Sequence, residues 1–167
     1  MAYLVRQLER KIWLSAELSA EIGGLQADAL KNFKTTSNSL SVFILEDKNN
    51  EELLHRILSA IASGRNSISE VDYAIFDCAI ISIVGIKHFA TPGQTADQQV
   101  NSLHIDLNNL TASQVIKMAE FISKEGTLSR VSKKAIQKSI SKGLSSGMLE
   151  KNRLNPTLLE KLQIQRD

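Results

Sequence analysis

The chain has very little cysteine and few aromatic residues. Its 167 residues include one cysteine, Cys78, and the aromatic content is 5%. A single cysteine cannot form an internal disulfide, which excludes a scaffold stabilised by disulfides and favours a reducing compartment such as the cytoplasm. The low aromatic content predicts a core made mainly of leucine, isoleucine, valine and alanine.

Long hydrophobic runs are also missing. The longest apolar stretch, residues 78–86, is interrupted by Ser82 and Gly85, whereas a helix needs roughly 20 apolar residues to cross a bilayer. Basic residues interrupt the first fourteen positions, which therefore lack the continuous apolar segment of a secretory signal. We expect a cytoplasmic protein with no membrane partner.

Standard motifs for nucleotide chemistry are absent as well. Neither G-x-x-x-x-G-K-[ST] nor G-x-G-x-x-G occurs in the sequence, so the usual phosphate and dinucleotide cradles are missing.

One G-x-S-x-G match spans 143–147, but a nucleophile elbow needs an apolar strand before the serine and a histidine after it. The last histidine is His104. We therefore predict a helix terminus at Ser145, no catalytic residue and no cofactor, and we lean against an enzyme.

The histidines and the cysteine offer few other possibilities. His55, His88 and His104 share no short metal-ligand spacing, so no metal site is predicted. The apolar neighbourhood of Cys78 raises the pKa expected for its thiol, and a structural role is favoured over a nucleophile with His88 as its base. His104 and Asp106 alternate along a predicted strand and share one face, so an enzyme using this pair with another polar residue is a third hypothesis.

Size and composition are those of an ordinary globular domain. The hydrophobic content is 43%, the charged content is 23% and the length fits one domain. The charge is unevenly divided: residues 1–100 hold nine Lys or Arg against twelve Asp or Glu, whereas residues 101–167 hold eleven against six. The net charge is therefore −3 for residues 1–100 and +5 for residues 101–167. Either the two parts pack against each other, or a basic surface is offered to another molecule.

The hydrophobic patterns predict an α+β fold. We expect a single domain in which 1–110 is an α/β part with one mixed sheet of three to five strands, and 111–167 is a helical basic part. Strands are predicted at 40–45, 71–75, 80–86 and 103–107. Helices are predicted at 3–22, 27–33, 50–63, 112–125, 129–145 and from Pro156 onward, with a strand at 3–5 as the alternative to the start of the first helix. The expected N-caps are Asn49 for 50–63 and Asn155 for the last helix, and Thr111 with Gln114 forms a capping box before 112–125.

The most informative pattern is a row of basic residues at intervals of four. It consists of Arg130, Lys134, Lys138 and Lys142, on a segment whose other side carries Ile136, Ile140 and Leu144. Like charges at this spacing oppose helix formation by roughly 0.2–0.5 kcal/mol per pair, so the row costs on the order of 1 kcal/mol. An anionic partner would offset this cost, and the row is therefore the predicted partner-binding surface.

Three kinds of partner fit such a row: this chain's own acidic part, an acidic protein surface or a second copy, and nucleic acid. The row would extend about 18 Å, comparable to several phosphates of a backbone. A helix-turn-helix needs a complete helix before its recognition helix, however, and only residues 127–130 follow Gly126. We predict a non-catalytic binding or regulatory protein of the accessory, immunity or antitoxin kind, with nucleic-acid binding through 130–142 as the alternative.

Overall fold

The computed structural model describes residues 2–13, 25–33 and 35–162. Among these residues, six strands form one sheet in the order β4-β5-β2-β1-β3-β6, and every neighbouring pair is antiparallel. The strands are β1 (Tyr3–Gln7), β2 (Leu40–Leu45), β3 (Val71–Asp77), β4 (Lys87–Ala90), β5 (His104–Asn108) and β6 (Thr127–Val131). The α+β class is confirmed, whereas the predicted mixed sheet of three to five strands is wrong in both number and direction.

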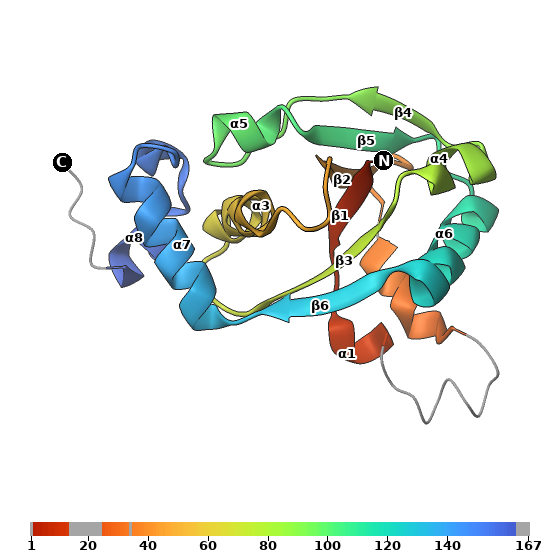
Figure 1. Ribbon diagram of the computed structural model, residues 1–167, viewed down its shortest axis with the longest axis horizontal. Coiled ribbons are helices and arrows are strands. Elements are labelled where there is room, and N and C mark those ends of the chain that lie inside the picture. The colour runs from red at the N-terminus through yellow and green to blue at the C-terminus, as the bar shows by residue number, and fades with distance from the viewer. Residues whose placement is uncertain (1, 14–24, 34, 163–167) are drawn as a thin grey trace.

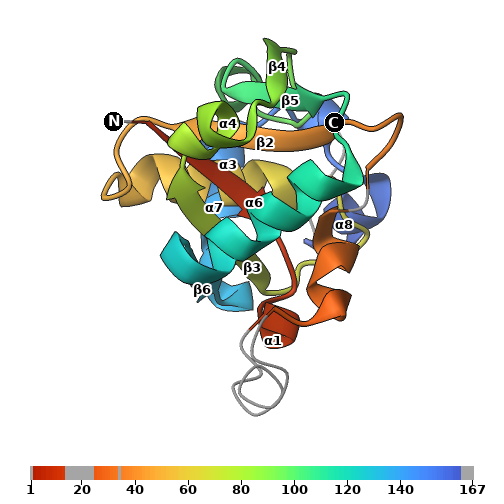
Figure 2. The ribbon, with the colours of Figure 1, turned by 90° about the vertical axis from the view of Figure 1, so that its right-hand side faces the viewer.

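Helices cover both faces of this sheet (Figures 1 and 2). On one side lie α3 (Glu51–Ser63) and α7 (Lys133–Ser145), and on the other lies α6 (Ala112–Glu125). The remaining helical segments are α1 (Arg10–Trp13), η1 (Ala27–Phe33), α4 (Ala79–Val84), α5 (Gln98–Asn101), η2 (Lys151–Arg153) and α8 (Pro156–Lys161). None of the helices in the described part of the chain has the length and apolar character that crossing a membrane requires.

Two hydrophobic cores follow from the alternation of side chains along the central strands. In β2, Val42 belongs to the core beneath α6, whereas Phe43 belongs to the core shared with α3 and α7. In β3, Phe76 likewise belongs to the core beneath α6, and Ile75 belongs to the core shared with α3 and α7. Because successive side chains of a strand point to opposite faces, strands that are apolar on both faces are buried between two layers. β2 accordingly lies in the interior of the sheet, between β5 and β1.

Several predicted helix ends are confirmed. The capping box of Thr111 and Gln114 begins α6, and Asn155 with Pro156 begins α8. Gly64 ends α3 as predicted. The N-cap of α3 is Asn50 rather than Asn49, because the Asn50 side chain accepts a hydrogen bond from the Leu53 backbone N–H at 3.0 Å.

The predicted strand at 80–86 is wrong, because this segment forms helix α4. Isoleucine and valine favour strands, but the local hydrogen bonds favour a helix here. The Asp77 carboxylate accepts a hydrogen bond from the Ala79 N–H at 2.8 Å. Gly85 then ends the helix in the left-handed conformation, with φ of 66°, which glycine adopts without steric cost. Asp77 thus marks the turn between β3 and α4.

The two other corrections concern strands that were taken for helices. Residues 3–7 form β1, so the strand alternative at 3–5 is the correct one, and only Arg10–Trp13 of the predicted helix is helical among the residues described there. The predicted helix at 129–145 begins later: β6 ends at Val131, and Ser132 caps α7 by accepting a hydrogen bond from the Ala135 N–H at 3.3 Å. The C-terminal third therefore contributes an edge strand to the sheet and is not wholly helical.

Candidate functional site

Arg130 does not belong to the helix that carries the other members of the basic row. It lies on β6, directly opposite Asp72 of β3. Its guanidinium donates hydrogen bonds to both oxygens of Asp72, at 2.6 and 3.0 Å, and forms an ion pair with Glu70 at 2.8 Å. The hydrogen bonds to Asp72 raise the pKa of Arg130 further above its already high value. The positive charge of Arg130 is thus already matched by the acidic N-terminal part of the same chain.

The other three members of the row lie on the exposed face of α7. Lys134, Lys138 and Lys142 are exposed, whereas Ile136 and Ile140 are fully buried on the opposite face, as predicted. The Lys142 ammonium lies 3.7 Å from the Glu52 carboxylate of α3. Both side chains are mostly exposed, and ion pairs of this kind contribute about 0–1 kcal/mol. Lys142 is therefore only loosely held.

The N-terminal half of α7 carries the uncompensated charge. Lys133, Lys134 and Lys138 form no ion pair with any described residue, and α7 contains no aspartate or glutamate. The first two lie in the first turn, where the helix dipole disfavours cations. This placement and the two like-charge pairs that remain in the row, Lys134 with Lys138 and Lys138 with Lys142, together destabilise the helix by on the order of 1–2 kcal/mol. We define the basic face of α7 as Lys134 and Lys138, with Lys133 exposed at the first position of the helix, about 100° around the axis from Lys134.

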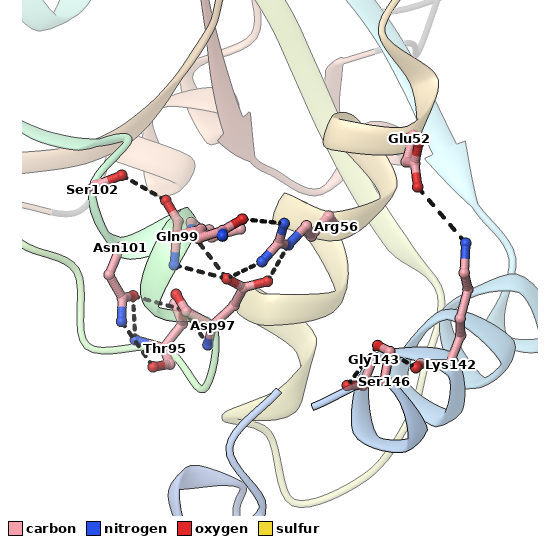
Figure 3. A network of polar contacts seen from close by, with 11 residues as sticks. Glu52, Arg56, Thr95, Asp97, Gln99, Asn101, Ser102, Lys142, Gly143 and Ser146 are labelled. Carbon is pink, nitrogen blue, oxygen red and sulfur yellow. Dashed lines mark hydrogen bonds and ion pairs between the residues drawn. The ribbon is translucent and has the colours of Figure 1, made fainter. Parts of the chain in front are cut away.

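A partly buried ion pair, with Arg56 22% exposed and Asp97 fully buried, links α3 to the segment before β5 (Figure 3). Arg56 of α3 donates from Nε and Nη2 to the carboxylate of Asp97, the second contact being 2.8 Å long. Its Nη1 donates to Gln99 Oε1 at 2.6 Å. Asp97 has a fully buried side chain and is also the N-cap of α5, where Oδ1 accepts from the backbone N–H groups of Gln99 and Val100. This arrangement fixes α5 against α3.

A hollow on the other side of the sheet, between α4 and α6, has a volume of about 720 Å³. Its charged lining includes Lys117, Glu120, Lys124 and Glu125, all from α6. Positive and negative charges are balanced on this helix, in contrast to α7. The α6 lysines therefore provide a matched comparison for the basic face of α7.

His104 and Asp106 do share one face of β5 and form a polar cluster with Thr91 and Ser41. Asp106 accepts hydrogen bonds from the hydroxyls of Thr91 at 2.7 Å and Ser41 at 2.9 Å. His104 Nδ1 lies 2.7 Å from the Thr91 carbonyl oxygen, to which it must donate a proton. The same nitrogen therefore cannot accept a proton from the Thr91 hydroxyl. This geometry supports a structural role, in which the cluster holds residue 91 against the sheet.

The electrostatics of Asp106 give a test of this structural role. Burial raises the pKa of Asp106, but the hydrogen bonds from Thr91 and Ser41 and the charge of His104 together outweigh it, so the net pKa lies below its usual value. A carboxyl whose pKa is lower in the folded than in the unfolded chain stabilises the fold above the unfolded pKa, about 3.9. This contribution is lost as the pH falls through the folded value.

We therefore expect Asp106→Asn to lower the free energy of unfolding by about 1 kcal/mol at neutral pH, because two charge-assisted hydrogen bonds are weakened. The difference between the variant and the unmodified chain should vanish at a pH below the folded pKa of Asp106. Urea unfolding at a series of pH values measures both quantities. An equal difference at neutral and strongly acidic pH would contradict this assignment.

The remaining sequence candidates lie apart from one another. Ser145 is exposed in the last turn of α7 and donates its hydroxyl to the Lys142 carbonyl oxygen at 3.0 Å. Cys78 is half-buried at the start of α4, and His88 is exposed on the edge strand β4. Within the described ranges, no three His, Cys, Asp or Glu residues are grouped so as to hold a metal ion. The structure thus brings together only His104 and Asp106 among these candidates.

Comparison with known proteins gives no relative: no family model matches the chain, and no match is found among the curated proteins or the solved structures. The functional argument therefore depends on the geometry of this chain alone. That geometry contains two features next to each other, the basic face of α7 and the ion-paired surface between α3 and α5.

Proposed function

We propose that this chain is a non-catalytic binding protein, of a regulatory kind and located in the cytoplasm, that contacts an acidic protein surface through the basic face of α7. The observation that carries the proposal is the absence of any ion pair between Lys133, Lys134 or Lys138 and the described residues, on a helix with no acidic residue of its own. Carboxylates of a partner would relieve the repulsion among these lysines and with the helix dipole.

Two observations favour a protein over nucleic acid as the partner. First, Arg130 is engaged by Asp72 and Glu70, so the predicted row of 130–142 loses one of its ends. Lys134, Lys138 and Lys142 extend about 12 Å along α7, against about 18 Å for the predicted row, so fewer phosphates can be followed.

Second, acidic residues border the basic face. Glu51 and Glu52 of α3 line the same hollow as Lys138 and Lys142. A nucleic-acid backbone lying along α7 would meet these carboxylates, and like charges placed against each other at an interface are strongly unfavourable. A protein surface can place its own cations opposite Glu51 and Glu52 and its carboxylates opposite the lysines.

The proposal is tested by NMR titration of the labelled chain with two probes, a short poly-glutamate peptide and a short DNA duplex. We expect the peptide to perturb the amide signals of α7 before those of α6. The double substitution Lys134→Glu with Lys138→Glu should abolish this perturbation, because it reverses the charge of the basic face. The matched control, Lys117→Glu with Lys124→Glu, makes the same charge change on α6 and should leave the perturbation of α7 intact.

Three outcomes would contradict the proposal. Equal loss in both double variants would show that only net charge matters. Perturbation centred on α6 would place the contact on the wrong face. Tight DNA binding with a salt slope near −0.9 per phosphate contacted would establish nucleic-acid binding instead. Sedimentation of the chain alone at increasing concentration identifies the case in which the acidic surface belongs to a second copy.

A further inference from the structure

Strand β4 ends the sheet and contributes no side chain to either hydrophobic core. All of its residues are exposed, and among the described strands it pairs with β5 alone. In Figures 1 and 2 it lies along the upper margin of the molecule, with no described element beyond it. In an antiparallel ladder, every second residue directs its N–H and C=O away from a given neighbour. The outer edge of β4 therefore presents unpaired backbone groups to solvent.

The two edges of the sheet differ in how they are protected. On β6, Val131 is buried and Arg130 is bound to Asp72 of the neighbouring strand. Proteins usually protect an edge strand with proline, a bulge or charged side chains. Residues 87–90 contain no proline, and their register with β5 advances one residue at a time without a bulge. Lys87 is the only protecting residue of this kind on β4.

The side chains of Lys87 and Phe89 lie on the same face of β4, because alternate residues of a strand share a face. Phe89 is 59% exposed and belongs to neither core. Lys87 is also exposed and forms no ion pair with a described residue. A strand added to this edge would cover the Phe89 ring and pair the free backbone groups.

We propose that β4 pairs antiparallel with β4 of a second copy of this chain, about a two-fold axis through His88. Such a contact uses the same surface twice, so residues equally far from His88 face each other. Lys87 of each copy then lies opposite Phe89 of the other. An ammonium over an aromatic ring is attracted by it, and the lysine stem covers the ring. The two lysines themselves lie at opposite ends of the contact.

This self-complementarity favours a second copy over a foreign strand. The order cation, centre, aromatic along Lys87, His88 and Phe89 supplies both halves of each cross-strand pair when the chain is reversed. Each copy also brings an edge that itself lacks a neighbour. Because β4 is short, the contact buries little area and the dimer is a weak one, as interfaces below about 1,200 Å² generally are. The inference does not depend on the role proposed for the basic face.

Sedimentation equilibrium of the complete chain, over a concentration series that reaches the millimolar range, tests this dimer. We expect the apparent mass to rise from that of a monomer toward that of a dimer. Phe89→Lys should leave the chain monomeric throughout, because each introduced lysine then faces Lys87 of the other copy, and like charges directly opposite are destabilising. Adding Lys87→Glu to Phe89→Lys should restore the dimer, since each introduced lysine then faces a glutamate. Both positions are exposed, so the fold tolerates these changes.

Ile83→Lys is the matched control, because it places the same charge at another exposed apolar residue, on α4, and it should leave the dimer intact. A chain that stays monomeric at every concentration would overturn the proposal, as would a dimer that persists in Phe89→Lys. Failure of the added Lys87→Glu to restore the dimer would exclude the pairing about His88. Equal loss in Ile83→Lys would show that only net charge matters, and loss in Lys134→Glu with Lys138→Glu would place the contact on α7 instead.

Discussion

Replacing Arg56 with methionine is expected to lower the free energy of unfolding by about 3 kcal/mol. The substitution keeps most of the side-chain volume but leaves the fully buried carboxylate of Asp97 without its cation. Removing one partner of a buried ion pair typically costs about 3–5 kcal/mol. We expect the lower end of this range, because the Asp97 carboxylate keeps its hydrogen bonds to the backbone N–H groups of Gln99 and Val100.

Urea unfolding at neutral pH measures this effect, with Arg153→Met as its control. Arg153 forms an ion pair with Glu150 at 2.9 Å, but its side chain is 45% exposed. Surface pairs of this kind contribute about 0–1 kcal/mol, so the control should be only slightly destabilised. Similar losses in the two variants would show that the Arg56–Asp97 pair is not the desolvated contact described above.

The second large effect is expected for Ile140→Ala, which should lower the free energy of unfolding by about 3 kcal/mol. Ile140 is fully buried on the inner face of α7 and belongs to the core formed with α3, which includes Ile57 and Leu58. Truncation to alanine removes apolar contacts and leaves a cavity, and such changes cost about 2–5 kcal/mol. Because α7 is anchored through this face, its amide protons should also exchange faster than those of α6 in the variant.

Ile116→Ala on α6 provides the comparison. Ile116 is 44% exposed, so its truncation should change the stability by less than about 0.5 kcal/mol. If Ile140→Ala were as mild as this control, or if exchange increased equally in α6 and α7, the packing of α7 against α3 would not be what holds the basic face in place.

Much of the fold follows from local patterns in the sequence. The starts of α6 and α8 were predictable because capping side chains act within three or four residues of the helix terminus, as Thr111 and Gln114 do. The central strand at 40–45 was predictable because both of its faces are apolar. The direction of the strands was not, because pairing joins distant segments such as β3 and β6, and nothing in either segment specifies the other.

The errors have similar physical causes. In α4, the isoleucines favour a strand, but the Asp77 side chain and Gly85 supply both ends of a short helix. In β6, a spacing of four residues from Arg130 to Lys134 fits a helix, yet Arg130 lies on a strand opposite Asp72 and donates hydrogen bonds to it. Regular spacing alone does not show where a helix begins.

The candidate site was predicted only in part. The basic and apolar sides of α7 follow from the amphipathic pattern and are where the sequence placed them. The Arg56–Asp97 pair was missed because its members are far apart in the chain, although Asp97 before a run of polar residues is a recognisable N-cap signal.

The most direct test of the contact proposed for α7 is site-specific photo-crosslinking in the cells that express the chain. A photoreactive residue placed at Gln137, exposed on α7 between Lys134 and Lys138, should form a nuclease-resistant adduct with an acidic protein. The same residue placed at the exposed Ile116 of α6 should not form that adduct, and Lys134→Glu with Lys138→Glu should abolish it. An adduct that nuclease removes, or one that forms equally from both positions, would contradict the proposed role of the basic face.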